Sequence, residues 1–230
     1  MSGAIPHCTI DGPSGVGKGT AAKWLATRLG WHLLDSGAMY RVAGIAAEQA
    51  GVALEDPEAV AAVVHEMQVR FDGDSASDRI ALNGQDITAA VREEGAGMLA
   101  SRIAVFPEVR DALLDAQRAF LQRPGLVADG RDMGSVVFPD APLKIFLDAS
   151  AEERARRRCQ QLRQAGMPAI LADVLTDIRA RDARDRGRKV APLKAAKDAV
   201  VIDTTELPID AVCERIFSHV QDSGLTAVAS

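Results

Sequence analysis

The sequence has few cysteines, no metal-ligand spacing among its four histidines and no hydrophobic run long enough to cross a membrane. The three cysteines, Cys8, Cys159 and Cys213, are widely spaced and form no Cys-x-x-Cys pair. This pattern favours reduced thiols over a disulfide framework. No secretory signal pattern is evident among the 230 residues. We therefore expect a cytoplasmic protein with no membrane partner.

An excess of basic residues is also lacking. The 27 Lys and Arg residues against 32 Asp and Glu residues give a formal net charge of −5 at pH 7. Broad nucleic-acid binding usually needs a basic surface, so no nucleic-acid partner is expected. Arginine is nevertheless concentrated locally, and the average charge conceals a basic site. A hydrophobic content of 47% is ample for the core of one α/β domain with insertions.

The most informative segment directly follows a short β-like run that ends at Asp11. Its pattern, Gly-x4-Gly-Lys-x-Thr, is close to the phosphate-binding loop of P-loop proteins. Glycines permit a close backbone approach to phosphate oxygens, the following helix N-terminus adds positive potential, and Lys18 supplies a mobile positive charge. The residues expected to bind nucleotide phosphates are Gly12, Pro13, Ser14, Gly15, Val16, Gly17, Lys18, Gly19 and Thr20.

One position departs from the common form of this loop. Gly19 follows Lys18, where a serine or threonine hydroxyl usually ligates magnesium, and Thr20 comes one residue later. The variant argues against a loop hydroxyl as a direct metal ligand. We expect Mg²⁺ to bind together with the nucleotide, held by phosphates and water, and we expect no metal site built from protein side chains.

Strand-like apolar runs alternate with helical patterns along the chain. The expected strands are His7–Asp11, His32–Leu34, Leu126–Ala128, Leu143–Leu147 and Ala199–Ile202. The expected helices are Lys18–Leu29, Gly37–Gln49 capped by Ser36, Pro57–Glu66, a short helix capped by Thr88, Glu108–Leu121, Ala151–Gln164, Leu171–Asp185 and Ile209–Val220. The alternation predicts an α/β fold with a parallel sheet covered on both faces.

The middle of the chain has a different pattern. Gln68–Asp72 and Arg79–Asn83 form a hairpin pattern with a polar loop between them, and Asn83-Gly84 is a further turn signal. A hairpin fits poorly into a parallel sheet, so we predict an inserted subdomain. The expected single domain has a core at about 1–35, 104–150 and 190–230, an insert at about 36–103 and a helical lid at about 151–189. Residues 226–230 are expected to form a frayed tail.

Two further segments carry candidate acceptor chemistry. In the segment Asp35–Arg41, a helix start lies close to Arg41, and this combination can bind an anion. The alternative is a capped helix with a solvated Arg41. In the segment Leu126–Gly134, the residues Asp129, Arg131 and Asp132 follow an expected strand. They lie at its carboxyl end, which is where parallel sheets bind ligands. There Arg131 can pair with phosphate and Asp132 can accept hydrogen bonds from a base or ribose. The alternative is a surface loop of salt bridges.

Arginines are dense at 154–158 and 179–188. In a helix, Arg181, Asp185 and Arg188 would share one face and could contact a phosphate and a ribose together. The helical hairpin from Ala151 to Lys189 would then be a mobile lid. A solvated helix face is the usual meaning of such a run, and it explains the arginines that we interpret as structural: Arg156, Arg163, Arg184 and Arg186.

Taken together, these segments resemble the bacterial cytidylate kinases of the nucleoside monophosphate kinase superfamily. The resemblance extends from about Thr9 to Val220. It is carried by the segments Asp11–Thr20, Leu34–Arg41, Asp129–Gly134, Val136–Ala141, Ile178–Asp182 and Ala191–Leu193. It implies a P-loop three-layer α/β/α fold with a parallel five-stranded core sheet, an inserted monophosphate-binding subdomain and a helical lid. The lid segment 166–170 departs from the family, whose members often carry a tyrosine nearby.

The resemblance implies phosphoryl transfer from ATP, bound by the phosphate loop, to CMP or dCMP. By this similarity the cytosine ring is bound by Ser36, Ser101, Arg110 and Asp132, the CMP phosphate by Arg41, Arg131 and Arg188, and the sugar by Arg181 and Asp185. Tyr40 completes the CMP set, and Lys18, Arg131 and Arg188 would be the catalytic residues. A monomer is expected.

Two other functions stay open at this point. A P-loop kinase could act on another small acceptor, such as UMP or a sugar acid. A nucleotide-binding switch protein without catalysis would share the loop, but this chain lacks an Asn-Lys-x-Asp guanine-binding segment. Screening nucleoside monophosphates with ATP separates these alternatives.

Overall fold

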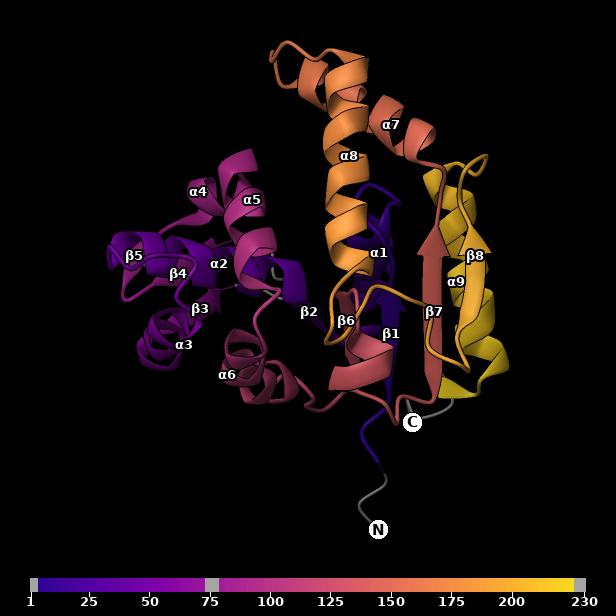
Figure 1. The fold of residues 1–230 in the computed structure, drawn as a ribbon. Helices are drawn as coiled ribbons and strands as arrows, with labels where there is room; N and C mark the ends of the chain where they lie inside the picture. The colour runs from indigo at the N-terminus through magenta and orange to yellow at the C-terminus, as the bar shows by residue number, and fades with distance from the viewer. Residues whose placement is uncertain (1–3, 73–78, 226–230) are drawn as a thin grey trace. The chain divides into compact units, whose positions relative to one another are not determined.

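The computed structural model describes residues 4–72 and 79–225 (Figure 1). Its larger sheet has five strands, in the order β2-β6-β1-β7-β8. These strands are β1 (His7–Asp11), β2 (His32–Asp35), β6 (Leu126–Gly130), β7 (Leu143–Asp148) and β8 (Val200–Asp203). The pairs β1–β7, β2–β6 and β7–β8 are all parallel. The predicted parallel α/β fold is therefore confirmed.

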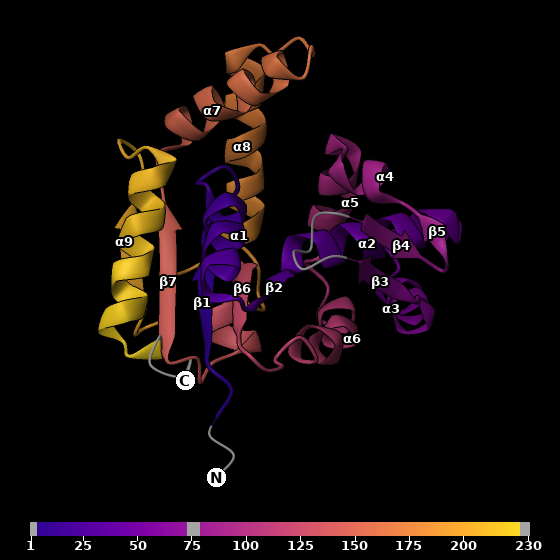
Figure 2. The same ribbon diagram turned by 180° about the vertical axis from the view of Figure 1, so that it is seen from behind.

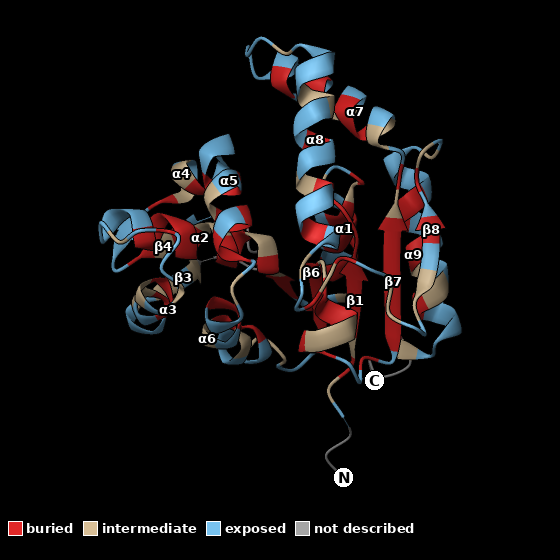
Figure 3. Ribbon diagram, in the orientation of Figure 1, coloured by how far each residue is buried: buried red, intermediate tan, exposed pale blue. Residues whose placement is uncertain are grey.

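The three central strands of this sheet, β1, β6 and β7, are buried along most of their length. β6 is buried at every residue, and β7 is buried at all but its last residue (Figure 3). Both strands are rich in apolar residues and do not alternate with polar ones, which is typical of strands covered on both faces.

The helices follow the predicted alternation closely. They are α1 (Lys18–Leu29), α2 (Ser36–Gln49), α3 (Pro57–Glu66), α4 (Thr88–Arg92), α5 (Glu94–Ile103), α6 (Pro107–Arg118), α7 (Ala151–Gln164), α8 (Leu171–Arg186) and α9 (Ile209–Asp222). A π-helical turn, η1 (Met133–Val137), follows β6. Among the described residues, no helix combines the length and hydrophobicity needed to span a bilayer.

The chain divides into two compact units. Unit 1 contains Met1–His7 and Ala26–Asp129, and unit 2 contains Cys8–Leu25 and Gly130–Ser230. The last of these divisions falls at the end of β6, between Asp129 and Gly130. The predicted boundaries of core, insert and lid stay predictions.

Unit 1 contains the predicted hairpin. Strands β3 (Val69–Asp72), β4 (Arg79–Leu82) and β5 (Gln85–Asp86) form an antiparallel sheet. The polar loop predicted between the first two strands lies outside the described residues. A cluster of buried side chains from α2 and β4, among them Val42, Ile45 and Leu82, packs this sheet against the helices. Helix α2 also packs on α5, and α3 packs on α6.

Unit 2 contains a helical hairpin made by α7 and α8, which pack against each other (Figure 1). Helix α9 packs on β7, as the view from behind shows (Figure 2). The buried residues of α8 are Ile178, Asp182 and Asp185, at helical spacing, and the rest of the helix is exposed or half-buried. Two of these three residues are acidic, so this buried face needs charged partners.

Several local predictions were wrong. Asp35, not Ser36, caps α2, because its side chain accepts a hydrogen bond from the Ala38 amide at 2.8 Å. Thr88 is the first residue of α4 and not its cap. Helix α6 ends at Arg118, before the predicted Leu121, and α5 and η1 were not expected. The predicted tail at 226–230 lies outside the described residues.

Candidate active site

The phosphate loop connects the end of β1 to the start of α1. Gly12 has φ +149°, and a Cβ there would lie 2.1 Å from the Leu147 carbonyl oxygen of β7. Gly15 and Gly17 have φ +83° and +94°. Only glycine adopts these conformations readily, and only glycine fits at position 12. The loop backbone is therefore set by its glycines, as the motif predicts.

Lys18 is the first residue of α1, and it is 8% exposed. Its Nζ donates to the Pro13 carbonyl at 2.8 Å, which folds the side chain back over the loop. A positive charge is thus held at a helix N-terminus whose own amide groups favour anions.

Two residues outside the motif hold the loop from behind, and the sequence analysis did not single them out. The Arg154 Nη1 atom donates to the Ser14 carbonyl at 3.2 Å, and Thr204 Oγ1 donates to the Val16 carbonyl at 3.2 Å. Both residues are buried. They satisfy loop carbonyls, which leaves the amide groups as the loop's phosphate-binding surface. No local pattern identifies them, since each is distant from the loop in sequence.

Arg154 also makes a buried ion pair with α8. Its two terminal nitrogens reach the two carboxylate oxygens of Asp182 at 3.0 and 2.5 Å. The arginine and aspartate side chains are 2% and 8% exposed. The phosphate loop and α8 therefore share one arginine.

Asp185 is the centre of a second charged cluster in unit 2. It pairs with Arg131 through Nε at 2.5 Å and also with Arg188. Burial by itself raises the pKa of Asp185, but the charges of Arg131, Arg188 and Arg181 outweigh it and lower that pKa. The structure thus brings together four of the residues that the sequence proposed for substrate binding.

The position of Arg188 differs from the prediction. Helix α8 ends at Arg186 with Gly187 as its cap, so Arg188 lies beyond the helix. Its side chain is 5% exposed, so Arg188 does not lie on a solvated helix face. The contact with Asp185 is an i, i+3 pair that continues one turn past the end of the helix.

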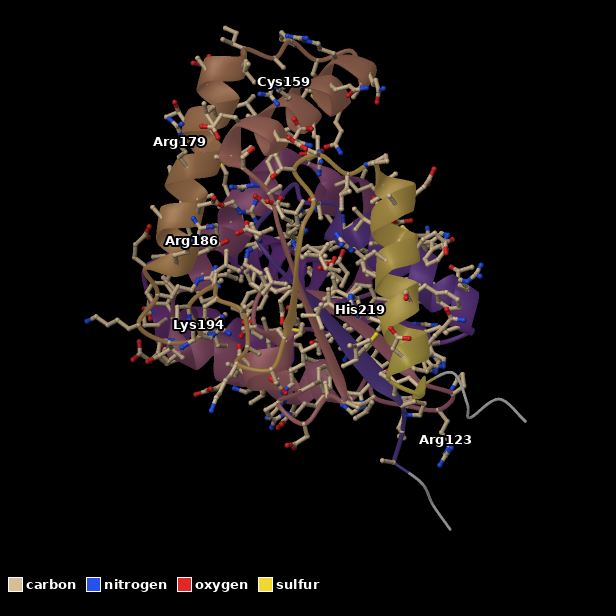
Figure 4. All side chains as sticks on the ribbon, turned by 90° about the vertical axis from the view of Figure 1, so that its right-hand side faces the viewer. Arg123, Cys159, Arg179, Arg186, Lys194 and His219 are labelled. Carbon is tan, nitrogen blue, oxygen red and sulfur yellow. The ribbon has the colours of Figure 1, made fainter. Side chains whose placement is uncertain are left out.

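Most of the arginines interpreted as structural are exposed and paired locally. Arg156 pairs with Glu153 at 2.5 Å, Arg163 donates to the Ala169 carbonyl, and Arg186 lies 3.9 Å from Asp182. Arg179, which shares α8 with Arg186 in Figure 4, pairs with Glu152. Such exposed pairs contribute little to stability.

Unit 1 carries the other half of the proposed CMP residues. Ser36, Tyr40, Ser101 and Arg110 are buried, and Arg41 is half-buried. Arg110 lies over the Tyr40 ring, 5.9 Å from its centroid.

Hydrogen bonds orient several of these side chains. Ser36 Oγ accepts from Gln117 Nε2 at 2.9 Å. Arg41 donates to the Val91 carbonyl at 3.2 Å, and Arg110 donates to the Ala104 carbonyl at 3.4 Å. Gln117, 2% exposed, was missed by the sequence analysis because a lone glutamine on a helix carries no signal.

Asp132 stands between β6 and the turn η1, and it is 3% exposed. Asp11, at the end of β1, is also buried. Burial raises the pKa of Asp11 to about 7, and the Asp132 charge adds to the rise. Hydrogen bonds from the Gly134 and Met133 amides and the charge of Lys18 act in the opposite direction. Two carboxyl groups and one lysine thus share a buried region of unit 2.

No group of three or more His, Cys, Asp or Glu side chains in residues 4–72 and 79–225 is arranged to hold a metal ion. Cys8, Cys159 and Cys213 are all buried free thiols. The chemical features of the site are therefore anion-binding amides, one lysine, several arginines and buried aspartates.

A glycine loop with a lysine, placed between the first strand of a parallel sheet and a helix, defines the class of P-loop nucleotide-binding proteins. Within this class, the cytidylate kinase family model matches residues 8–222, and the chain belongs to this family. A cytidylate kinase of Pseudomonas aeruginosa (strain LESB58) is 56% identical over 227 residues, covering 97% of this chain and 99% of the relative. One of Aeromonas salmonicida (strain A449) is 53% identical over 230 residues, covering all of both chains. The resemblance stated from the motifs is confirmed.

Proposed function

We propose that this chain transfers the terminal phosphoryl group of ATP to CMP, giving ADP and CDP. The observation that carries the proposal is the phosphate loop with the buried Lys18 in a chain of this family. The Asp185 cluster, which supplies three arginines, supports it. We include dCMP as an acceptor by the same resemblance.

The proposed site residues divide between the two nucleotides. The phosphates of ATP are bound by the loop Gly12, Pro13, Ser14, Gly15, Val16, Gly17, Lys18, Gly19 and Thr20. The residues proposed for CMP are Ser36, Tyr40, Arg41, Ser101, Arg110, Arg131, Asp132, Arg181, Asp185 and Arg188. The burial of most of these polar side chains supports the assignment, because such groups occur inside proteins mainly where they are paired or bind ligands.

The reaction needs no general base, because the acceptor phosphate is already an anion. The obstacle is to bring two anions together and to stabilise charge on the transferring phosphoryl group. Lys18, Arg131 and Arg188 supply the positive charge. Asp185 keeps both arginines oriented, so they need little reorganisation when substrate binds. We expect the α7–α8 hairpin to act as a lid that excludes water, which would otherwise hydrolyse ATP.

Mg²⁺ is proposed to bind with ATP and to neutralise phosphate charge. The donor set fits an ion held mainly by phosphate oxygens and water. Gly19 offers no hydroxyl next to Lys18, and the described residues hold no three-residue cluster of metal-binding side chains. Thr20, at the exposed start of α1, is the loop's one hydroxyl near this position, and Asp129 could orient metal-bound water.

We further propose that the protein works as a cytoplasmic monomer. The three free thiols and the ATP and CMP substrates support a reducing compartment. Sedimentation of the purified protein at catalytic concentrations tests the oligomeric state.

The assigned acceptor can be tested by substrate preference. With ATP and Mg²⁺, we expect CMP and dCMP to be phosphorylated with much higher kcat/KM than UMP, AMP or GMP. A coupled assay for ADP measures all five. Omitting the acceptor gives the background ATP hydrolysis. A clear preference for AMP or GMP, or ATP turnover without an acceptor, would contradict the proposal.

Asp132→Ala is expected to weaken the use of CMP more than the binding of ATP. Loss of a buried hydrogen-bond partner of the cytosine amino group costs about 1–3 kcal/mol, so kcat/KM for CMP should fall by roughly 10- to 100-fold. Steady-state kinetics with each substrate varied, together with calorimetric ATP binding, separate the two effects. Equal weakening for ATP and CMP would instead indicate a structural role of Asp132 in its loop.

A further inference from the structure

Asp11 is a buried carboxyl group for which the mechanism above has no role. It is the last residue of β1 and directly precedes Gly12 of the phosphate loop. Its Oδ1 accepts from the Met133 amide at 2.8 Å, and its Oδ2 accepts from the Gly134 amide at 2.8 Å. Both oxygens of one side chain thus bind two consecutive backbone amides, 122 and 123 residues away in sequence.

Those two amides are the first of the turn η1. The first amides of a helical turn have no intrahelical partner and need another acceptor. Asp132 is the residue before the turn, yet its side chain makes no capping hydrogen bond, and its backbone carbonyl accepts from Val136 and Val137 instead. Asp11 therefore provides the cap that Asp132 does not, and the Asp132 carboxyl group is not used for this local purpose.

The surroundings of Asp11 contain two charged side chains and a closely packed turn. Asp132 and Lys18 face Asp11 closely enough to shift its pKa in opposite directions. A Cβ on Gly134 would lie 2.7 Å from Thr9 Oγ1, so the turn also packs tightly against β1. The backbone after Asp132 is thus held to β1 by two buried hydrogen bonds and by close packing.

We propose that Asp11 is a positioning residue that orients Asp132 for CMP by capping the turn that Asp132 begins. It touches no substrate. It acts on the acceptor side of the reaction, although it lies next to the donor-binding loop. This inference rests on the CMP-binding role proposed above for Asp132.

The test is a double-mutant cycle with Asp11→Asn and Asp132→Ala. Asparagine keeps the shape of the side chain, but its amide nitrogen cannot accept from the Gly134 amide. We expect kcat/KM for CMP to fall by roughly 10- to 100-fold, since the buried Gly134 amide is left without its acceptor. The KM for ATP should change by less than about threefold, a difference that a purely structural defect would not produce. The double variant should have the same kcat/KM for CMP as Asp132→Ala alone, because Asp11 acts on CMP only through Asp132.

Asp56→Asn is the matched control. Asp56 also caps a helix, accepting from the Ala59 amide at 3.0 Å, but it is exposed and lies at the start of α3 in unit 1. It should leave both KM values unchanged. Thermal melting shows which variants are folded. Where Asp11→Asn does not fold, Asp11→Ser, whose hydroxyl accepts one bond without an opposing amide, takes its place in the cycle.

The outcomes separate this inference from the proposed function. Losses that add in the double variant, or equal losses for ATP and CMP, would overturn the role of Asp11 while leaving Asp132 in place. An Asp11→Asn variant with normal CMP kinetics would also overturn the positioning role of Asp11. An Asp132→Ala variant that uses CMP normally would remove the role of Asp132 and, with it, the route proposed for Asp11.

Discussion

Lys18→Ala is expected to lower kcat by roughly 10²-fold or more while the protein stays folded. The side chain donates a hydrogen bond to the Pro13 carbonyl of the phosphate loop, and its charge lies at the N-terminus of α1. Removing it takes away a cation placed where charge develops on the transferring phosphoryl group. The hydrogen bond to the Pro13 carbonyl contributes about 1 kcal/mol, so its loss should lower the melting temperature by only a few degrees.

Lys23→Ala is the matched control for this prediction. Lys23 is an exposed lysine on the same helix, five residues further along, and its replacement should leave kcat within about twofold, as is usual for exposed side chains. Initial rates at saturating ATP and CMP, with thermal melting of each variant, provide the comparison. A folded Lys18→Ala enzyme with near-normal kcat would remove Lys18 from the mechanism.

Arg188→Ala is expected to lower kcat by about 10³-fold, the lower end of the effect of an arginine that stabilises a transferring phosphoryl group. ATP affinity measured alone should change much less. An arginine on the solvated face of an open lid would add little to stability, but the side chain of Arg188 is 5% exposed and paired with Asp185. Because Asp185 keeps Arg131 as a partner, we expect the free energy of unfolding to fall by only about 1–3 kcal/mol. For a protein of this size, each kcal/mol lowers the melting temperature by about 2–4 °C.

Arg186→Ala separates this role from a general effect of charge at the end of α8. Arg186 is 53% exposed and only 3.9 Å from Asp182, so its removal should change neither kcat nor melting appreciably. Rates, calorimetric ATP binding and melting curves of both variants are the required measurements. If Arg188→Ala is fully active, or if Arg186→Ala is equally impaired, the arginines form a structural ion-pair network and the catalytic assignment of Arg188 is wrong.

The phosphate loop could be predicted completely because its determinants are adjacent in the chain. The glycines, the lysine and the start of the helix follow each other within nine residues, and their positive φ angles are local properties of glycine. The strands of the larger sheet were predicted nearly as well, since short continuous apolar runs between helical segments are typical of strands buried on both faces. For the same local reason, the helix α8 was found but its end was misplaced by one residue.

The choice between two neighbouring capping residues could not be made from sequence. Asp35 and Ser36 are both good caps, and local propensity does not rank them reliably. The structure assigns the cap to Asp35 and gives the Ser36 hydroxyl to Gln117, 81 residues away. Gln117 is buried, so its amide needs a hydrogen-bond partner inside the unit, and the Ser36 hydroxyl is that partner.

The sequence alone determined that this is a P-loop protein of the α/β class, and it located the loop, the alternation of strands and helices, and the acidic and basic residues around the end of β6. Only the tertiary structure decided which polar groups hold that loop and the segment after Asp132. Arg154 and Thr204 bind loop carbonyls, and Asp11 binds the Met133 and Gly134 amides, across separations of 122 to 188 residues. The physical reason is that a buried backbone group must find a partner wherever the fold brings one, and sequence separation does not limit that choice.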